Sequence, residues 1–282
     1  MNQSVPDAPD QPWDKAAQGW NRHSTLVNDW LRGITDAMLT AAGIAEGARV
    51  LDVAAGAGGQ TLDIARRVGS HGAVLATDIS PRILELAAAN ARAAGLTQVT
   101  TRVADAQALG LAGSGFDAAV SRLGLMFCPQ PQLAFESIAA ALRSGGRFAA
   151  VVFSQPQTNP CIAILMSTAR RHAGLAPGSP FEPGSLCSLG KPGLAAELLS
   201  EAGFIDVRVE PVAAPMQLPT AGHYLDFVRS SGSPIMQILA PLPEAARDGA
   251  WADMQTQLNR FADASGWCGP NELLLCSGRL AG

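Results

Sequence analysis

The sequence predicts an α/β fold in which a doubly wound, mostly parallel sheet of seven strands carries helices on both faces, together with helical lid insertions. Three observations support this fold class. Apolar, β-prone runs alternate with helical patterns between residues 50 and 153, as in parallel sheets whose strands are connected by helices. The first run, 50–53, stops at a glycine-rich turn that opens a helical pattern. Polar or acidic residues follow several runs, at the sheet edge where such folds bind ligands.

Length and composition limit the class of protein. With 282 residues, 48% hydrophobic and 16% charged, the chain is long enough for one large α/β domain with an insertion and too apolar to be disordered. The net charge of −4 and the lack of a Lys/Arg cluster argue against nucleic acid as a partner. No apolar run approaches the ~18 residues of a membrane span, and residues 1–14 do not resemble a signal peptide. Five scattered cysteines without a C-x-x-C motif are typical of reduced thiols, so we expect a cytoplasmic protein.

The first half of the chain contains the elements of a parallel sheet in order. Residues 13–43 are expected to be mostly helical, because Leu26, Trp30 and Ile34 share one face and Gly43 supplies a stop. Ser80, followed by proline, is a typical helix N-cap. By the same criteria, strands are expected at 50–53, 73–77, 98–103, 116–120 and 147–153, with helices after residues 59, 80 and 131.

In the second half of the sequence, strand and helix patterns alternate less regularly. Helices are expected at 161–172 and 192–202, a strand at 204–210, and an antiparallel strand at about 272–278 beside it. Between the two strands the patterns indicate apolar helices only. We therefore expect an N-terminal helical lid (1–45), a ligand-binding core (46–153), an insertion (154–190), and a C-terminal part of the core (191–282) with a helical cap at about 212–269.

The glycine-rich turn indicates which class of ligand to expect. Nicotinamide and flavin enzymes use G-x-G-x-x-G, and here Thr61 occupies the third glycine position. Asp52 lies inside the strand before the turn, where an acid suits a ligand with a positive charge, such as an amino acid attached to a nucleoside. The segment Asp-Val-Ala-Ala-Gly-Ala-Gly at 52–58 resembles motif I of class I S-adenosylmethionine-dependent methyltransferases. Ala54 resembles the variant of the ubiquinone/menaquinone C-methyltransferase-like (methyltransferase type 11/25) branch.

This resemblance implies a Rossmann-like fold, S-adenosyl-L-methionine as cofactor and S-adenosyl-L-homocysteine as product. It implies that Asp78 accepts hydrogen bonds from the ribose hydroxyls, and that Asp105 accepts one from the adenine amino group. Trp20, in the helix before the first strand, is expected to touch the cofactor. The full set of expected cofactor-binding residues is Trp20, Asp52, Ala54, Gly56, Ala57, Gly58, Gln60, Asp78, Ile79, Asp105, Ala106 and Ser121.

The segment after the fourth strand indicates the acceptor. It lacks the N/D-P-P-Y/F motif of amino-methylating enzymes and the acids that hold magnesium, so we expect no metal. Many small-molecule methyltransferases have L-H-H-x-P-D there, whereas residues 125–130 are Leu-Met-Phe-Cys-Pro-Gln. We therefore expect methyl transfer mainly by proximity and orientation. The weak candidates for a general base are His23, His172 and His223, and the expected pocket for a small, largely apolar (aromatic, quinol-like or natural-product) acceptor contains Met126, Phe127, Phe181 and Tyr224.

Two alternatives remain open at this stage. A nicotinamide-dependent oxidoreductase of the same fold class is disfavoured by Thr61 and Asp52. A regulatory module that binds S-adenosylmethionine without catalysis is consistent with the missing histidines after the fourth strand. No pattern in the sequence indicates an oligomeric state.

Overall fold

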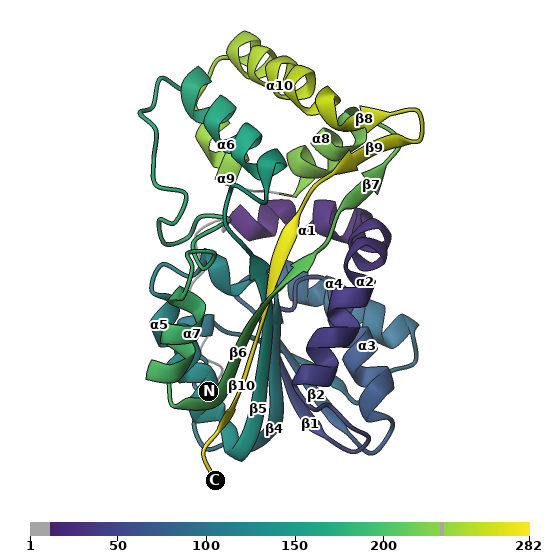
Figure 1. Ribbon diagram of the computed structural model, residues 1–282. Helices are drawn as coiled ribbons and strands as arrows, with labels where there is room; N and C mark the ends of the chain where they lie inside the picture. Colours follow the sequence, from purple (N-terminus) through teal and green to yellow (C-terminus); the bar gives the residue numbers. More distant parts are fainter. Residues whose placement is uncertain (1–11, 232–233) are drawn as a thin grey trace, which may run out of the picture.

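The computed structural model describes residues 12–231 and 234–282 and contains one seven-stranded sheet in the order β3-β2-β1-β4-β5-β10-β6. Strands β1 to β5 pair in parallel, whereas β10 is antiparallel to both β5 and β6 (Figure 1). The predicted fold class, a mostly parallel sheet of seven strands, is confirmed. The strands span β1 Arg49–Val53, β2 Ala73–Asp78, β3 Val99–Val103, β4 Phe116–Arg122, β5 Leu142–Phe153, β6 Phe204–Ala213 and β10 Glu272–Leu280.

Helices cover both faces of this sheet. One face carries α2 (Ser24–Ala41), α3 (Gly59–Val68) and α4 (Pro81–Ala93), and the other carries α5 (Pro131–Ala141) and α7 (Leu194–Glu201) (Figure 1). Val50, Leu51 and Val53 of the central strand β1 are completely buried between the two layers, because a parallel strand inside such a sheet is covered from both sides. Short 3-10 helices, η1 (Ala106–Ala108) and η2 (Leu125–Phe127), follow β3 and β4.

A second layer, the cap, lies beyond the carboxyl ends of the parallel strands (Figure 1). It consists of the helices α6 (Pro160–His172), α8 (Ala221–Ser230), α9 (Pro234–Leu239) and α10 (Glu244–Leu258), the 3-10 helix η3 (Asn259–Phe261), and the strands β7 (Met216–Leu218), β8 (Ala262–Asp263) and β9 (Gly266–Gly269).

The cap differs from the sequence prediction in one respect. We expected only helices at 212–269, but β7, β9 and β8 form a three-stranded antiparallel sheet there. Strands of two to four residues show no readable periodicity. They are held by tertiary packing instead: Trp267 of β9 is 1% exposed, and its Nε1 donates a hydrogen bond to Leu258 O (2.8 Å).

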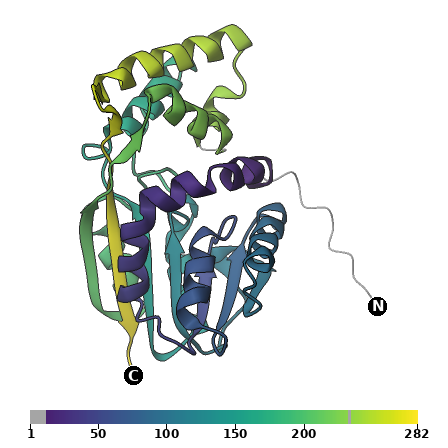
Figure 2. The same cartoon turned by 90° about the vertical axis from the view of Figure 1, so that its right-hand side faces the viewer.

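Helix α1 (Pro12–Arg22) lies between the sheet and the cap (Figure 2). On the core side, Asp14 accepts hydrogen bonds from Ser80 Oγ and from the amide of Arg82 at the start of α4. On the cap side, a Cβ added at Gly19 would lie 1.8 Å from Ser230 O of α8, so only glycine permits this approach. Residues 1–11 of the predicted lid lie outside the described residues. No helix in the described part of the chain is long and apolar enough to cross a membrane.

Candidate active site

A cavity of about 290 Å³ opens at the carboxyl edge of the sheet, beneath α1. We call it the donor cavity. It brings together nine of the twelve predicted cofactor-binding residues: Trp20, Ala54, Gly56, Ala57, Gln60, Asp78, Ile79, Asp105 and Ala106. The remaining three, Asp52, Gly58 and Ser121, do not line it, and the Oγ of Ser121 is buried without a hydrogen-bond partner among the described residues.

The turn after β1 depends on its glycines for two different reasons. Gly56 (φ +58°) and Gly58 (φ +88°) both have left-handed backbone conformations that disfavour side chains. At Gly58 an added Cβ would also lie 3.1 Å from Ala87 Cβ of α4. Gly58 therefore allows α4 to pack closely against the turn, while Gly56 itself faces the cavity.

Two residues of the cavity floor have left-handed conformations although they are not glycine: Ala54 (φ +54°) and Leu123 (φ +57°). Such a conformation costs about 1–2 kcal/mol for a residue with a Cβ. A Cβ added at Gly124 would lie 2.4 Å from Ala54 Cβ. Gly124 thus provides the space that the alanine in motif I requires.

Two acidic residues, Asp78 at the end of β2 and Asp105 after β3, line the cavity. Asp78 Oδ2 accepts a hydrogen bond from Gly56 N, and its Oδ1 accepts one from Ser80 N, both at 3.0 Å. Burial raises the pKa of Asp78, and the backbone hydrogen bonds oppose that shift. Asp105 caps η1 by accepting from Gln107 N (2.9 Å). Hydrogen bonds from backbone amides therefore hold both carboxylates in fixed positions.

Asp52 does not line the cavity, but it contacts Gln60, which does. Its carboxylate is completely buried and accepts hydrogen bonds from Gln60 Nε2 (3.0 Å) and Thr61 Oγ1 (2.6 Å). Burial raises its pKa to about 6, against the effect of these two hydrogen bonds and of the Arg122 charge. Gln60 lines the cavity, so Asp52 orients a lining side chain from behind.

Sequence reasoning missed several residues of the donor cavity. Arg122, at the end of β4, lines it together with Asn28 of α2, and Trp13 of α1 also contributes. We predicted Ser121 as a cofactor-binding residue but considered residues 122–124 only as an acceptor signal, although a lone arginine after a buried strand was itself a hint. Nothing in the sequence indicates that Asn28 faces the same cavity, because its place depends on how α2 packs.

A smaller apolar pocket of about 70 Å³, the cap pocket, adjoins the donor cavity, and the two share Trp20, Leu123 and Phe127. Of the four residues expected around an acceptor, Met126, Phe127 and Tyr224 line the cap pocket, whereas Phe181 lines neither cavity. The other lining residues are Trp30, Phe153, Ile162, Leu165, Leu186, Met216, Phe227, Val228, Ser231, Ile235 and Asn271.

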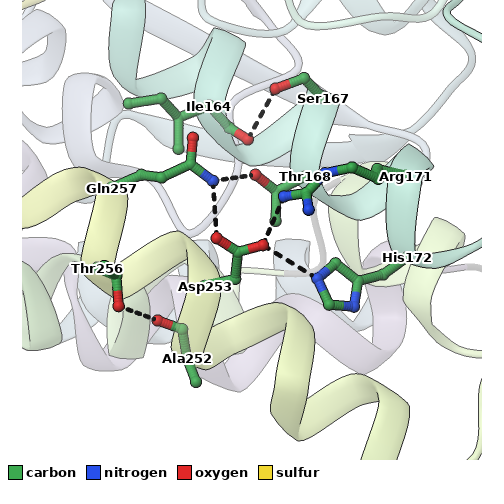
Figure 3. Close-up of polar contacts among 9 residues, drawn as sticks. All are labelled: Ile164, Ser167, Thr168, Arg171, His172, Ala252, Asp253, Thr256 and Gln257. Carbon is green, nitrogen blue, oxygen red and sulfur yellow. Dashed lines mark hydrogen bonds and ion pairs between the residues drawn. The ribbon is translucent and has the colours of Figure 1, made fainter.

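None of the three candidate histidines lines either cavity. His172 Nε2 pairs with Asp253 Oδ2 (3.1 Å) in a polar cluster between α6 and α10 (Figure 3). His223 is exposed and its Nδ1 shares a hydrogen bond with Thr220 Oγ1 (2.8 Å). His23 packs edge-on against Phe227, with ring centroids 5.5 Å apart, and burial lowers its pKa.

The ionisable groups that do face the two cavities include two with strongly raised pKa values. Burial raises the pKa of Cys128, on the donor cavity, to about 12. Burial also raises the pKa of Tyr224, on the cap pocket, whose ring stacks on Trp267. Across residues 12–231 and 234–282, no three His, Cys, Asp or Glu side chains are grouped as metal ligands.

Comparison with known proteins gives a family for this site. A family model described as a methyltransferase domain matches residues 44–186, which is half of the chain. An uncharacterized protein of Mycobacterium tuberculosis is 34% identical over 161 residues, covering 57% of this chain and 56% of the relative. A ubiquinone/menaquinone biosynthesis C-methyltransferase of Yersinia pestis is 33% identical over 119 residues, covering 42% of this chain and 47% of the relative. The chain thus spans about half the length of these curated relatives.

The fold is also found in solved structures. The crystal structure of a putative methyltransferase from Bacillus halodurans superposes with a TM-score of 0.60 and covers 88% of this chain and 99% of its own. Its identity of 17% carries information on the fold alone.

Proposed function

The chain belongs to the methyltransferase-domain family, and from this premise we propose that it transfers a methyl group from S-adenosylmethionine to a small, largely apolar acceptor. One observation carries the proposal: the donor cavity and the cap pocket share Trp20, Leu123 and Phe127. A donor in the first and an acceptor in the second would meet at these three side chains.

The residues of the donor cavity fit S-adenosylmethionine. The carboxylate of Asp78 suits ribose hydroxyls, Asp105 suits an adenine amino group, and both lie at neighbouring strand ends. The rings of Trp13 and Trp20 suit a cationic group, since aromatic faces attract positive charge. When bound, S-adenosylmethionine supplies a methyl group on a positively charged sulfur, and S-adenosylhomocysteine remains after transfer.

The chain contributes alignment rather than proton transfer. Cys128 and Tyr224 remain protonated near neutral pH because burial raises the pKa of each. The apolar walls of the cap pocket exclude water, and alignment of two bound reactants supplies about 7–11 kcal/mol of the barrier. The acceptor must therefore carry an atom that is already nucleophilic near neutral pH, as a quinol-like or phenolic compound of low pKa does.

A second candidate is a protein that binds S-adenosylmethionine without transferring its methyl group. It is favoured by the lack of a histidine, among the described residues, in the lining of the donor cavity and of the cap pocket. The nicotinamide-dependent oxidoreductase considered from the sequence loses its support, because the matched family is a methyltransferase domain.

The test separates binding from turnover. Calorimetry with S-adenosylhomocysteine measures donor binding, and mass spectrometry follows a labelled methyl group from S-adenosylmethionine into phenolic and quinol acceptors. We expect binding together with equal amounts of methylated acceptor and S-adenosylhomocysteine. Binding without transfer to any acceptor would support the second candidate, and absence of binding would overturn both.

A further inference from the structure

Arg122 is the last residue of β4, and its guanidinium lies in the wall of the donor cavity. Nη1 donates a hydrogen bond to Thr35 Oγ1 (2.8 Å) and Nη2 donates one to Asn28 Oδ1 (3.1 Å), both on α2. These two partners are neutral. They fix the direction of the guanidinium without neutralising its charge.

No carboxylate of the described residues forms an ion pair with Arg122. Asp52 and Asp63 act on it only through space, and the carboxylate of Asp52 already accepts from Gln60 and Thr61. Burial lowers the pKa of Arg122 to about 10, so the group remains a cation at neutral pH. A desolvated cation without a direct counter-ion is costly, and an anion in the cavity would offset that cost.

The guanidinium lies directly beside the start of α3. A Cβ added at Gly59, the first residue of α3, would lie 2.9 Å from Arg122 Nη2. The preceding residue, Gly58, offers no side-chain cap to the amides of the first turn. Free amides at a helix start attract anions, and here they lie beside a half-buried cation.

The order of the strands indicates which anion fits. Asp105 follows β3, Asp78 ends β2, the glycine-rich turn follows β1 and Arg122 ends β4, and these four strands are neighbours in this order. Neighbouring strands lie about 4.8 Å apart, so Arg122 is roughly 10 Å along the sheet edge from Asp78. A nucleoside at the two acids would carry its attached amino acid toward β4.

We propose that Arg122 binds the carboxylate of the methionine part of S-adenosylmethionine, with Asn28 and Thr35 holding the guanidinium in place. This assignment rests on the proposed function. It makes Arg122 the group that distinguishes an amino-acid nucleoside from a nucleoside without a carboxylate.

The test compares two ligands in calorimetry: S-adenosylhomocysteine and its decarboxylated analogue, which keeps the adenosine, the thioether and the amine. For Arg122→Met we expect the Kd of S-adenosylhomocysteine to rise about 10- to 100-fold, as for the loss of a charged hydrogen bond. The Kd of the decarboxylated analogue should stay within a factor of about two, which also shows that the variant is folded. Arg122→Lys should fall between, because lysine keeps the charge but not the planar fork.

Arg102→Met is the matched control, because it removes an exposed arginine from the same sheet and should change neither Kd. Equal weakening of both ligands by Arg122→Met would show a structural role, and unchanged binding of both would exclude the contact, so either result overturns the inference. If the unaltered protein binds neither ligand, it is the proposed function that fails.

Discussion

The donor cavity and the cap pocket are neighbours, but they are built differently. The donor cavity has polar groups at four adjacent strand ends among its apolar lining residues, and backbone contacts between neighbouring strands, such as Gly56 N to Asp78 Oδ2, hold them. Mostly apolar side chains, with Ser231 and Asn271 among them, define the cap pocket, and they come from many elements distant in the sequence. The first arrangement fixes individual atoms, whereas the second fixes mainly shape. We therefore expect point changes to have larger and more specific effects on the donor side.

The largest effect is expected for Asp78→Ala. Removing this carboxylate eliminates the predicted hydrogen bonds to two hydroxyl groups, each worth about 1.5–3 kcal/mol with a charged acceptor, so the Kd of S-adenosylhomocysteine should rise by roughly 10²-fold or more. Calorimetry measures the change. Asp117→Ala is the control. This carboxylate lies at the amino end of β4, away from the cavity, and accepts hydrogen bonds from Arg49 N (2.8 Å) and Arg143 Nε (2.7 Å), so its loss should leave the Kd unchanged. An unchanged Kd for Asp78→Ala would show that this carboxylate does not hold the donor.

On the acceptor side, Phe127→Ala should reduce kcat/KM for the acceptor by about 10- to 100-fold, with KM rising and kcat falling together. Phe127 lines both cavities and packs on Trp13 with ring centroids 4.8 Å apart, so its loss loosens the acceptor. Steady-state kinetics measures both parameters. Phe181→Ala is the matched control, because this phenylalanine lines neither cavity. Equal losses in both variants would contradict the position of the acceptor.

A double-mutant cycle tests the floor of the donor cavity. Gly124→Ala should lower the free energy of unfolding by about 1–3 kcal/mol, because its Cβ would meet that of Ala54. Adding Ala54→Gly should restore most of this loss by making the space available and removing the left-handed alanine. Urea unfolding of the four proteins measures the coupling. Additive effects would mean that the two positions accommodate each other in another way.

Asp52 gives a pH dependence with a definite sign. Between its unfolded value of 3.8 and its folded pKa of about 6, the folded protein retains a proton that the unfolded chain loses. Stability should therefore fall as the pH rises through this window, and ionised Asp52 should cost about 1–3 kcal/mol at pH 7. Asp52→Asn should stabilise the protein more at pH 7.5 than at pH 4, as measured by urea unfolding. The same stabilisation at both pH values would place the pKa of Asp52 elsewhere.

The smallest effects are expected for the histidines. His23→Ala, His172→Ala and His223→Ala, made singly, should each lower kcat by less than about 10²-fold, because a general base contributes about 10²–10⁴-fold and none of the three lines a cavity. Asp253→Asn breaks the polar cluster of Figure 3 from the other side and serves as the control for His172→Ala. One histidine variant with a loss above about 10³-fold and unchanged donor binding would show that alignment alone does not drive the reaction.

The same contrast explains what the sequence could predict. The core strands were predicted because β-prone segments alternate with helical patterns and end at turn residues, and the expected roles of Asp78 and Asp105 followed from the resemblance to class I methyltransferases together with their places after these segments. The place of Arg122 depends on contacts with Thr35 and Asn28, 87 and 94 residues away in the chain. The strands β7, β8 and β9 are too short to show a period, and their sheet forms around Trp267. Local patterns thus predict most of the donor cavity but not Arg122, while the cap pocket depends on packing that no local pattern encodes.

The position of β10 has a consequence for synthesis. This strand lies between β5 and β6, yet residues 272–280 are translated after every other strand of the sheet. Until they leave the ribosome, β5 has a free edge on the buried run 148–153, and β6 has no partner in the sheet at all. A free apolar edge is a template for pairing with other chains. Insertion of β10 is therefore the step that covers the free edge of β5 and gives β6 its place in the sheet.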